Sequence, residues 1–250
     1  PDITRLTGDM LQIADLLRLQ NRNLQEAREL CEAAVQLLHD GAGMTNPNFV
    51  WGLTSLGTLL ERSGDLERAE ELLLQALTVR RRTFGEDHPL VAGSMGVYAS
   101  FLVRNGRAQE AEELFRRAVE INLRTVGPSH SRHGGTLGGL ASALHHQGRL
   151  AEADSVMGEA IRIRVGAQGR RTPLIAQNLA THADIKTAMG SFREAEALLL
   201  EALDIASDQR LQGVVPGKIH ASFVRLYEAW GRPDAAEEHR DLAIDGRFVF

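Results

Sequence analysis

The chain has 250 residues, of which 43% are hydrophobic and 24% are charged, and its formal net charge is −5. This balance supports a folded core rather than wholesale disorder, and a pI near 6.0 lacks the basic excess of a nucleic-acid binder. A single cysteine excludes an internal disulfide framework and a multi-cysteine zinc site, and neither a membrane span nor a signal peptide is visible. The simplest interpretation is a cytoplasmic protein with no cofactor and no membrane or nucleic-acid partner.

A motif of the type GDLERAEELLLQAL recurs through the whole chain. Its copies begin at Arg22, Gly64, Gly106, Gly148, Gly190 and Gly231, at spacings of 42, 42, 42, 42 and 41 residues. A period this regular is the sequence signature of a repeat array.

Each unit predicts two helices joined by a tight turn. The second helix carries alanines seven residues apart, such as Ala69 and Ala76, which lie on one helical face. Gly64 and its equivalents suit the turn between the helices, and Pro47, Pro89 and Pro173 suit the first turn of a helix. No segment alternates with period two, so no sheet is expected. The predicted helix pairs span about residues 4–40, 47–84, 89–126, 131–168, 173–208 and 216–245, in a single domain over 1–250 that ends in a tail over 246–250.

These units resemble tetratricopeptide repeats (TPRs) of the 42-residue kind found in kinesin light chains and in the tails of bacterial signalling proteins, including serine/threonine kinases. The resemblance rests on segments such as FGEDHPLVAGSMGVYASFLVRNGRAQEAEELFRRAV and covers about residues 4–245. It implies an all-α fold, a right-handed superhelical solenoid of about six helix pairs. The resemblance does not imply kinase activity, because the chain has no Gly-rich phosphate loop and no HRD-like or DFG-like motif.

In such arrays the first helix of each pair lines a concave groove, which is the usual binding surface. The family's ligand-facing positions, counted back from each turn glycine, define the predicted binding surface of this chain. Its members are Trp51, Thr54, Ser55, Thr58, Arg62, Gly96, Val97, Ser100, Arg104, Gly138, Ser142, His145, His146, Gln177, Thr181, Asp184 and Arg225.

Two ligand classes known for TPR relatives are not expected here. Kinesin light chains carry asparagine pairs that hold a peptide backbone, whereas this chain has Thr54/Ser55, Gly96/Val97, Gly138/Gly139 and Ala180/Thr181 at those places. The Lys/Asn/Arg clamp that chaperone-binding relatives use for a terminal carboxylate has no matching set. The predicted mechanism is a preformed groove in which hydroxyls and amides bond a partner backbone.

Six glycines fall inside predicted first helices: Gly93, Gly96, Gly134, Gly135, Gly138 and Gly139. Each costs roughly 0.5–1 kcal/mol relative to alanine in a helix interior, so some compensation is expected. Close helix packing is one explanation, and a groove kept open for a partner is the other.

Histidines gather in the fourth pair, at His130, His133, His145 and His146. A metal site needs three or four ligands, and two adjacent histidines on a helix diverge by about 100°, so no metal site is predicted. Ser142, His145 or His146, and Asp184 invite comparison with a hydrolytic triad, but no nucleophile-elbow motif supports it. A solvated polar rim is the simpler interpretation, and no catalytic residue is predicted.

Arginines recur near the ends of the second helices, for example in the run Arg80–Arg82. There they complement the helix dipole, or form a ridge for an acidic partner. Trp51 and Trp230 suit either an interface or an end of the stack, and Cys31 suits a small core position. The apolar tail over 246–250 is expected to seal the last repeat, or to mediate self-association.

The sequence thus predicts a non-catalytic scaffold that binds a protein or peptide. One alternative is a regulatory or sensor segment of a larger bacterial signalling protein. A hydrolytic or metal-binding solenoid is the second alternative.

Overall fold

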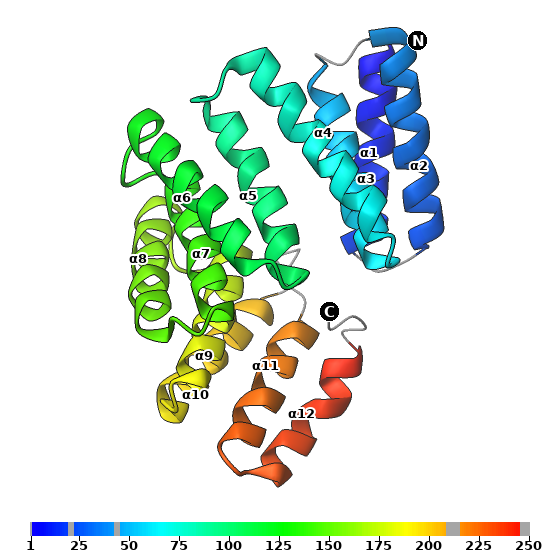
Figure 1. Cartoon of the computed structure of the whole chain (residues 1–250). Helices are drawn as coiled ribbons and strands as arrows, with labels where there is room; N and C mark the ends of the chain where they lie inside the picture. Colours follow the sequence, from blue (N-terminus) through cyan, green and yellow to red (C-terminus); the bar gives the residue numbers. More distant parts are fainter. Residues whose placement is uncertain (1, 20–22, 43–45, 209–215, 246–250) are drawn as a thin grey trace. The chain divides into compact units, whose positions relative to one another are not determined.

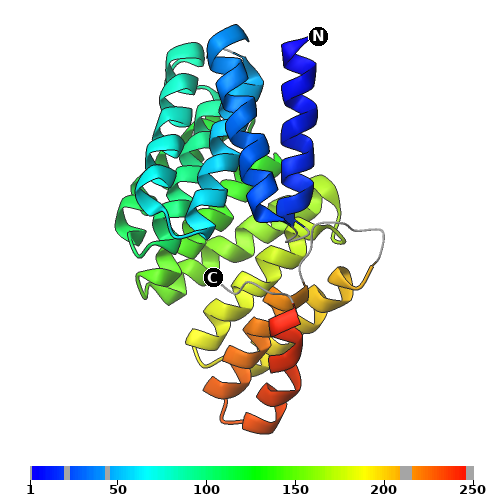
Figure 2. The same ribbon diagram turned by 90° about the vertical axis from the view of Figure 1, so that its right-hand side faces the viewer.

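The computed structural model describes residues 2–19, 23–42, 46–208 and 216–245. Over these ranges the chain is all α-helical, with twelve α-helices, one π-helical turn and no strand (Figures 1 and 2). The first helices of the six pairs are α1 (Ile3–Leu19), α3 (Pro47–Arg62), α5 (Pro89–Arg104), α7 (Ser131–His146), α9 (Pro173–Ala188) and α11 (Pro216–Ala229). The second helices are α2 (Leu24–Leu37), which the turn η1 (Leu38–Ala42) follows, α4 (Leu66–Phe84), α6 (Ala108–Thr125), α8 (Leu150–Gln168), α10 (Phe192–Ala206) and α12 (Pro233–Asp245).

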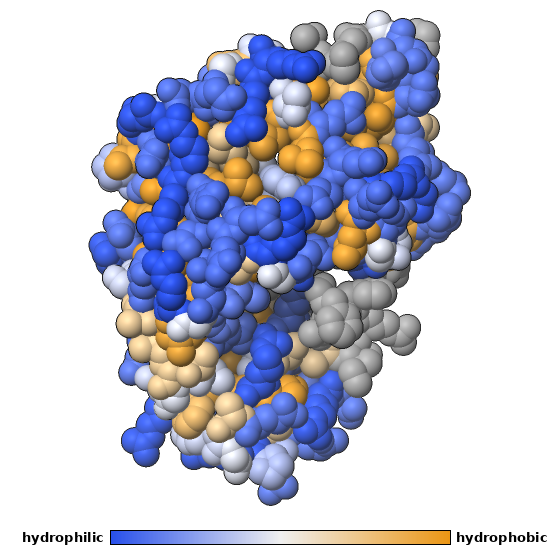
Figure 3. Space-filling model, in the orientation of Figure 1, coloured by the Kyte–Doolittle hydropathy of each residue, from blue (hydrophilic) through white to orange (hydrophobic). Residues whose placement is uncertain are grey.

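The helices group into two compact units, Pro1–Phe101 and Leu102–Phe250. The predicted all-α fold of helix pairs is confirmed, whereas a single domain over 1–250 stays a prediction. The tail over 246–250, with its predicted sealing or self-association, lies outside the described residues. No helix in the described part of the chain is long and apolar enough to cross a membrane. The face drawn in Figure 3 is mainly hydrophilic, with hydrophobic side chains in small scattered groups.

The turn inside each pair requires a left-handed backbone. Gly148, for example, has φ 76°, and the amide of the next residue, Arg149, bonds back to the carbonyl of Leu144 at 3.0 Å, as in a glycine-terminated helix. The first pair has no glycine at this turn. There Asn23 adopts φ 43°, and its side chain accepts a hydrogen bond from the Glu26 amide; asparagine enters this region more readily than most residues.

Small residues let the helices of a pair approach closely. The alanines predicted to face the partner helix are buried, with Ala69, Ala111, Ala153, Ala195 and Ala236 all at 0% exposure. Four residues further along, each second helix of pairs two to five inserts one large apolar side chain, which we call the wedge residue. The wedge residues are Leu73, Phe115, Met157 and Leu199, all at 2% exposure or less. Leu199 shares a core cluster with Ile219 and Phe223 of the next first helix, α11, so the wedge also joins successive pairs.

A carboxylate recurs on the second helices, 42 residues apart, and bonds to the following pair. Glu70 accepts from the Tyr98 hydroxyl at 2.6 Å, and Glu196 accepts from the Tyr227 hydroxyl at 2.7 Å. At the same position Asp154 lies 2.7 Å from His182 Nε2 and accepts from Lys186 at 3.0 Å. We call these residues, with Glu112, the bridging carboxylates.

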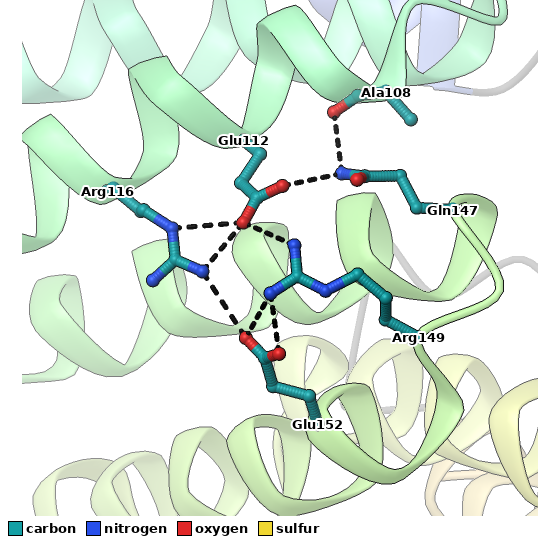
Figure 4. Close-up of polar contacts among 6 residues, drawn as sticks. All are labelled: Ala108, Glu112, Arg116, Gln147, Arg149 and Glu152. Atoms are coloured by element: carbon teal, nitrogen blue, oxygen red, sulfur yellow. Dashed lines mark hydrogen bonds and ion pairs between the residues drawn. The ribbon is translucent and has the colours of Figure 1, made fainter.

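Glu112 has the densest set of partners (Figure 4). Its side chain is 14% exposed and accepts from Gln147 at 2.8 Å, Arg149 at 2.7 Å and Arg116 at 2.6 Å. Burial alone would raise the pKa of this carboxyl, but the three hydrogen bonds outweigh it and lower the pKa to about 2. The ionised form of Glu112 therefore stabilises the joint between α6 and the α7–α8 turn.

A second polar contact joins the end of a second helix to the next first helix. Arg80 Nη1 donates to the Leu90 carbonyl at 3.1 Å and to the Ser94 hydroxyl at 3.0 Å. The same position holds Asn122, which donates to Thr136 at 2.8 Å. From the sequence Arg80 suits the helix dipole or a surface ridge. In the structure its half-buried side chain instead links two helices.

Replacing the turn glycine Gly148 by alanine should destabilise the protein by about 1 kcal/mol, because a Cβ disfavours the left-handed conformation. Gly158 is the matched control: it lies inside α8, and a Cβ there would meet no atom within 4 Å. Gly158→Ala should therefore stabilise by up to about 1 kcal/mol through helix propensity. Urea unfolding followed by circular dichroism measures both, and two shifts of the same sign would contradict this account.

Glu112→Gln should lower the free energy of unfolding at neutral pH by about 1–3 kcal/mol, the usual contribution of hydrogen bonds to a charged group. Since the folded pKa lies below the ordinary 4.5, the contribution of Glu112 is complete above that value and is lost as the pH falls toward 2. The difference between wild type and variant should shrink over that interval in urea titrations. The exposed neighbour Glu113, changed to glutamine, is the control and should cause little change; a pH-independent effect of Glu112→Gln would argue against the assigned role.

Candidate binding surface on the first helices

The predicted binding surface spans the whole range of exposure. Five members are exposed: Val97, Arg104, His146, Gln177 and Arg225. Ten are half-buried: Trp51, Thr54, Thr58, Arg62, Gly96, Ser100, Ser142, His145, Thr181 and Asp184. Ser55 and Gly138 are buried, and their part in ligand contact stays a prediction.

In the first unit, three predicted residues of α3 bond to α1. Trp51 Nε1 donates to Asp15 at 2.9 Å, and the Ser55 hydroxyl donates to the same carboxylate at 3.3 Å. Arg62 donates to the Arg18 carbonyl at 3.3 Å. The indole N–H of Trp51 is therefore engaged within the fold, which leaves the ring face for a partner. Sequence reasoning missed Asp15, although its acidic side chain on a first helix was a visible signal.

In the second unit, the structure brings together Asp184 of α9 and Arg225 of α11. Arg225 Nη2 lies 3.0 Å from Asp184, and both side chains bond to the Ser222 hydroxyl. The half-buried ring of His145 lies in the field of this pair. Its pKa is lowered by burial and by His146, while Asp184 acts in the opposite direction. The guanidinium of Arg225 is thus oriented by an internal counter-ion while half of its side chain stays exposed.

Hydroxyl groups on this surface bond mainly to their own helix. Thr54, Thr58, Ser100 and Thr181 each donate to the carbonyl four residues earlier, at 2.8–3.1 Å. A hydroxyl has one proton and two acceptor lone pairs, so these groups keep acceptor capacity for a partner N–H. The predicted mechanism, in which hydroxyls and amides bond a partner backbone, stays a prediction, and the hydroxyls would take part in it as acceptors.

The histidine and serine of α7 do not form a nucleophile–base pair. His146 Nδ1 lies 2.9 Å from the carbonyl oxygen of Ser142 rather than from its hydroxyl. Within the described ranges, no three His, Cys, Asp or Glu side chains are arranged to hold a metal ion. Cys31 is fully buried, as expected for a core residue, and burial raises the pKa of its thiol to about 12.

Close packing accounts for several of the helix glycines. A Cβ at Gly139 would lie 2.3 Å from the ring of Phe115, the preceding wedge residue, and one at Gly134 would lie 3.1 Å from the Ala160 carbonyl. At Gly138 the nearest atom is Asn178 at 3.4 Å, an ordinary contact. Packing against neighbouring helices therefore explains Gly134 and Gly139 better than a groove kept open.

Gly139→Ala should destabilise the protein by about 1–3 kcal/mol, the usual result of overpacking a core. The neighbouring Gly138→Ala is the control and should be neutral or stabilising, because its methyl group fits and alanine favours the helix. Thermal unfolding of both variants tests this, and equal midpoints would remove the packing explanation.

The structure also gives the partners of other arginine and tryptophan residues that the sequence singled out. Arg170 and Arg171 pair with Glu201 and Asp204, at 2.5 Å each. Trp230 stacks on Phe192 at 5.6 Å between ring centroids, and the Arg232 guanidinium lies 3.7 Å from its ring centroid. Trp230 is therefore half-buried in the last pairs of the second unit.

Comparison with known proteins identifies the repeat class. A family profile described as tetratricopeptide repeat matches residues 50–124, 91–164 and 132–208. The chain belongs to the TPR family. No curated protein matches it significantly.

Several solved TPR-type structures share the fold. One is a Podosopora anserina structure described as kinesin light chain TPR-like repeats that are nearly identical to one another. Its sequence is 26% identical to this chain, with a TM-score of 0.62 over 84% of this chain and 99% of that one. BtubC (BKLC) from P. vanneervenii is 20% identical, with a TM-score of 0.64 over 99% and 91% of the two chains. A Rap protein complexed with Competence and Sporulation Factor is 16% identical, with a TM-score of 0.70 over 92% of this chain and 62% of that one.

Proposed function

We propose that this TPR protein is a non-catalytic scaffold that binds a protein or peptide along its first helices, within the cytoplasm. TPR arrays are a protein-interaction class, and the first helices line their concave binding surface. The observation that carries the proposal is the oriented, half-exposed Arg225 beside Asp184 and His145, with Gln177 exposed on α9. A fixed donor of this kind suits a partner's carbonyl or carboxylate oxygens.

The likeness to the Rap protein supports this use of the fold. That protein has been solved in complex with Competence and Sporulation Factor. A preformed array of helices limits the conformational entropy lost on binding. The non-catalytic part of the proposal is supported by His146, whose Nδ1 bonds to a backbone carbonyl instead of activating Ser142.

Charge and size changes on α9 and α11 should abolish partner binding without unfolding the protein. Gln177→Arg combined with Arg225→Glu alters the predicted binding surface, whereas Gln109→Arg makes the same Gln-to-Arg change at an exposed site on the second helix α6. Affinity capture from a lysate of the source organism, read by mass spectrometry, should recover one partner with wild type and with Gln109→Arg only.

Circular dichroism controls for folding of the three baits. A partner recovered equally by all three would place binding outside the first helices. If no bait recovers a protein, the scaffold proposal loses its support.

A further inference from the structure

Arg164 of α8 follows Arg80 and Asn122 in the 42-residue register, but its guanidinium lies between two first helices. On one side is α9, where Nη1 faces the Leu174 carbonyl at 3.5 Å and Asn178 Oδ1 at 3.4 Å. On the other side is α7, where a Cβ at Gly135 would lie 2.6 Å from Nη2. The guanidinium therefore occupies the space that a side chain at position 135 would need.

The hydrogen bonds of Arg164 are long and incomplete. Both come from Nη1 and exceed the usual length of about 2.7–3.2 Å, whereas Arg80 makes its two bonds at 3.1 and 3.0 Å. A guanidinium has five N–H donors, and Nε of Arg164 is buried without an acceptor in the described part of the chain. The adjacent Asn178 has the same deficit at its buried Nδ2. Two neighbouring donor groups therefore lack acceptors.

Arg164 also has no carboxylate partner among the residues that the structure describes. Burial lowers the pKa of this half-buried guanidinium, and no acidic group acts in the opposite direction. Other arginines of the second unit are paired, as Arg116 and Arg149 are with Glu112. A charge that is withdrawn from water without a partner is costly, so a bound group that supplies the missing negative charge would offset this cost.

Gly135 brings this cation to the edge of the predicted binding surface. The register position of Gly135 is that of Gln177, which follows 42 residues later, is exposed and belongs to that surface. Because Gly135 has no side chain, the guanidinium reaches this position from the second helix behind it. Sequence reasoning missed Arg164, since the family pattern places ligand-facing residues on first helices.

We propose that Arg164 and Asn178 form a binding site for an oxyanion, which is the carboxylate of a peptide side chain or a free phosphate ion. Either group accepts hydrogen bonds from both side chains and supplies the charge that the guanidinium lacks. The planar fork of arginine suits such a group in particular. The inference goes beyond the proposed function, and its test uses probe anions with purified protein, so the two proposals can fail separately.

The stability of the free protein distinguishes this site from a structural link. Arg164→Met removes the charge and keeps an unbranched side chain, so the thermal midpoint should stay unchanged or rise, because an unpaired cation is replaced by an apolar group. Arg80→Met is the matched comparison at the same register, and its midpoint should fall, because two good hydrogen bonds are lost. Scanning calorimetry measures both. Equal falls in the two midpoints would overturn the proposal.

Titrations followed by NMR test binding directly, with hexaglutamate peptide and inorganic phosphate as separate probes. At least one probe should shift the side-chain amide signal of Asn178 to saturation, and Arg164→Met should weaken its binding by about tenfold or more, the usual loss for a charge-assisted hydrogen bond. Arg162→Met is the control, because Arg162 is exposed on the same helix and carries the same charge. It should bind like wild type.

Gly135→Ala is a second variant that leaves Arg164 in place. Its methyl group displaces the end of a flexible side chain, so probe binding should weaken while the protein stays folded, as the NMR spectrum verifies. A response to hexaglutamate assigns the oxyanion to a peptide side chain, and a response to phosphate alone assigns it to a free anion. No saturable shift with either probe, or equal weakening by Arg162→Met, would overturn the proposal.

Discussion

The stacking of one helix pair on the next depends on what each second helix presents to the following first helix. An apolar wedge residue supplies the buried contact, as Phe115 does against Gly139. Beside it a bridging carboxylate bonds polar side chains of the next pair, as Glu112 does with Gln147 and Arg149. A largely buried carboxylate without partners would be costly, so these bonds let it lie beside the apolar contact.

This arrangement determines what the first helices can offer to a partner. Their inward residues are occupied by stacking, as Ser55 and Gly138 show by being buried. Many surface hydroxyls bond to their own helix, so direction and charge have to come from longer side chains. Asp184 orients Arg225 from the neighbouring pair, so the guanidinium proposed to recognise a partner is positioned by the repeat-to-repeat contact itself. If that proposal holds, stability and binding share residues in this TPR protein.

The two ends of the array differ in chemistry. The last pair replaces the wedge with Arg240 and surrounds it with acidic partners, so that end is suited to water. The first helix instead leaves Leu6 and Ile13 half-exposed.

Local features of this protein could be derived from its sequence alone. The 42-residue period, the turn glycines and the alanine positions predicted the helix pairs, because they depend on backbone conformation and on spacing within one helix. The TPR resemblance then indicated which helix carries the binding surface. Which members of that surface are accessible could not be predicted in this way.

Contacts between side chains that lie 14 to 36 positions apart in the sequence needed the tertiary structure. From the sequence Trp51 suits either an interface or an end of the stack, whereas in the structure its N–H bonds to Asp15. Arg80 suits a helix-end charge, whereas in the structure it bonds to Ser94. For Gly139 the sequence left close packing and an open groove as alternatives, and the structure shows that this glycine makes room for Phe115. The physical reason is the same in each case. The repeat period determines which face of a helix meets its neighbour, but the size and hydrogen bonding of the side chains across that contact decide which residues are left for a partner.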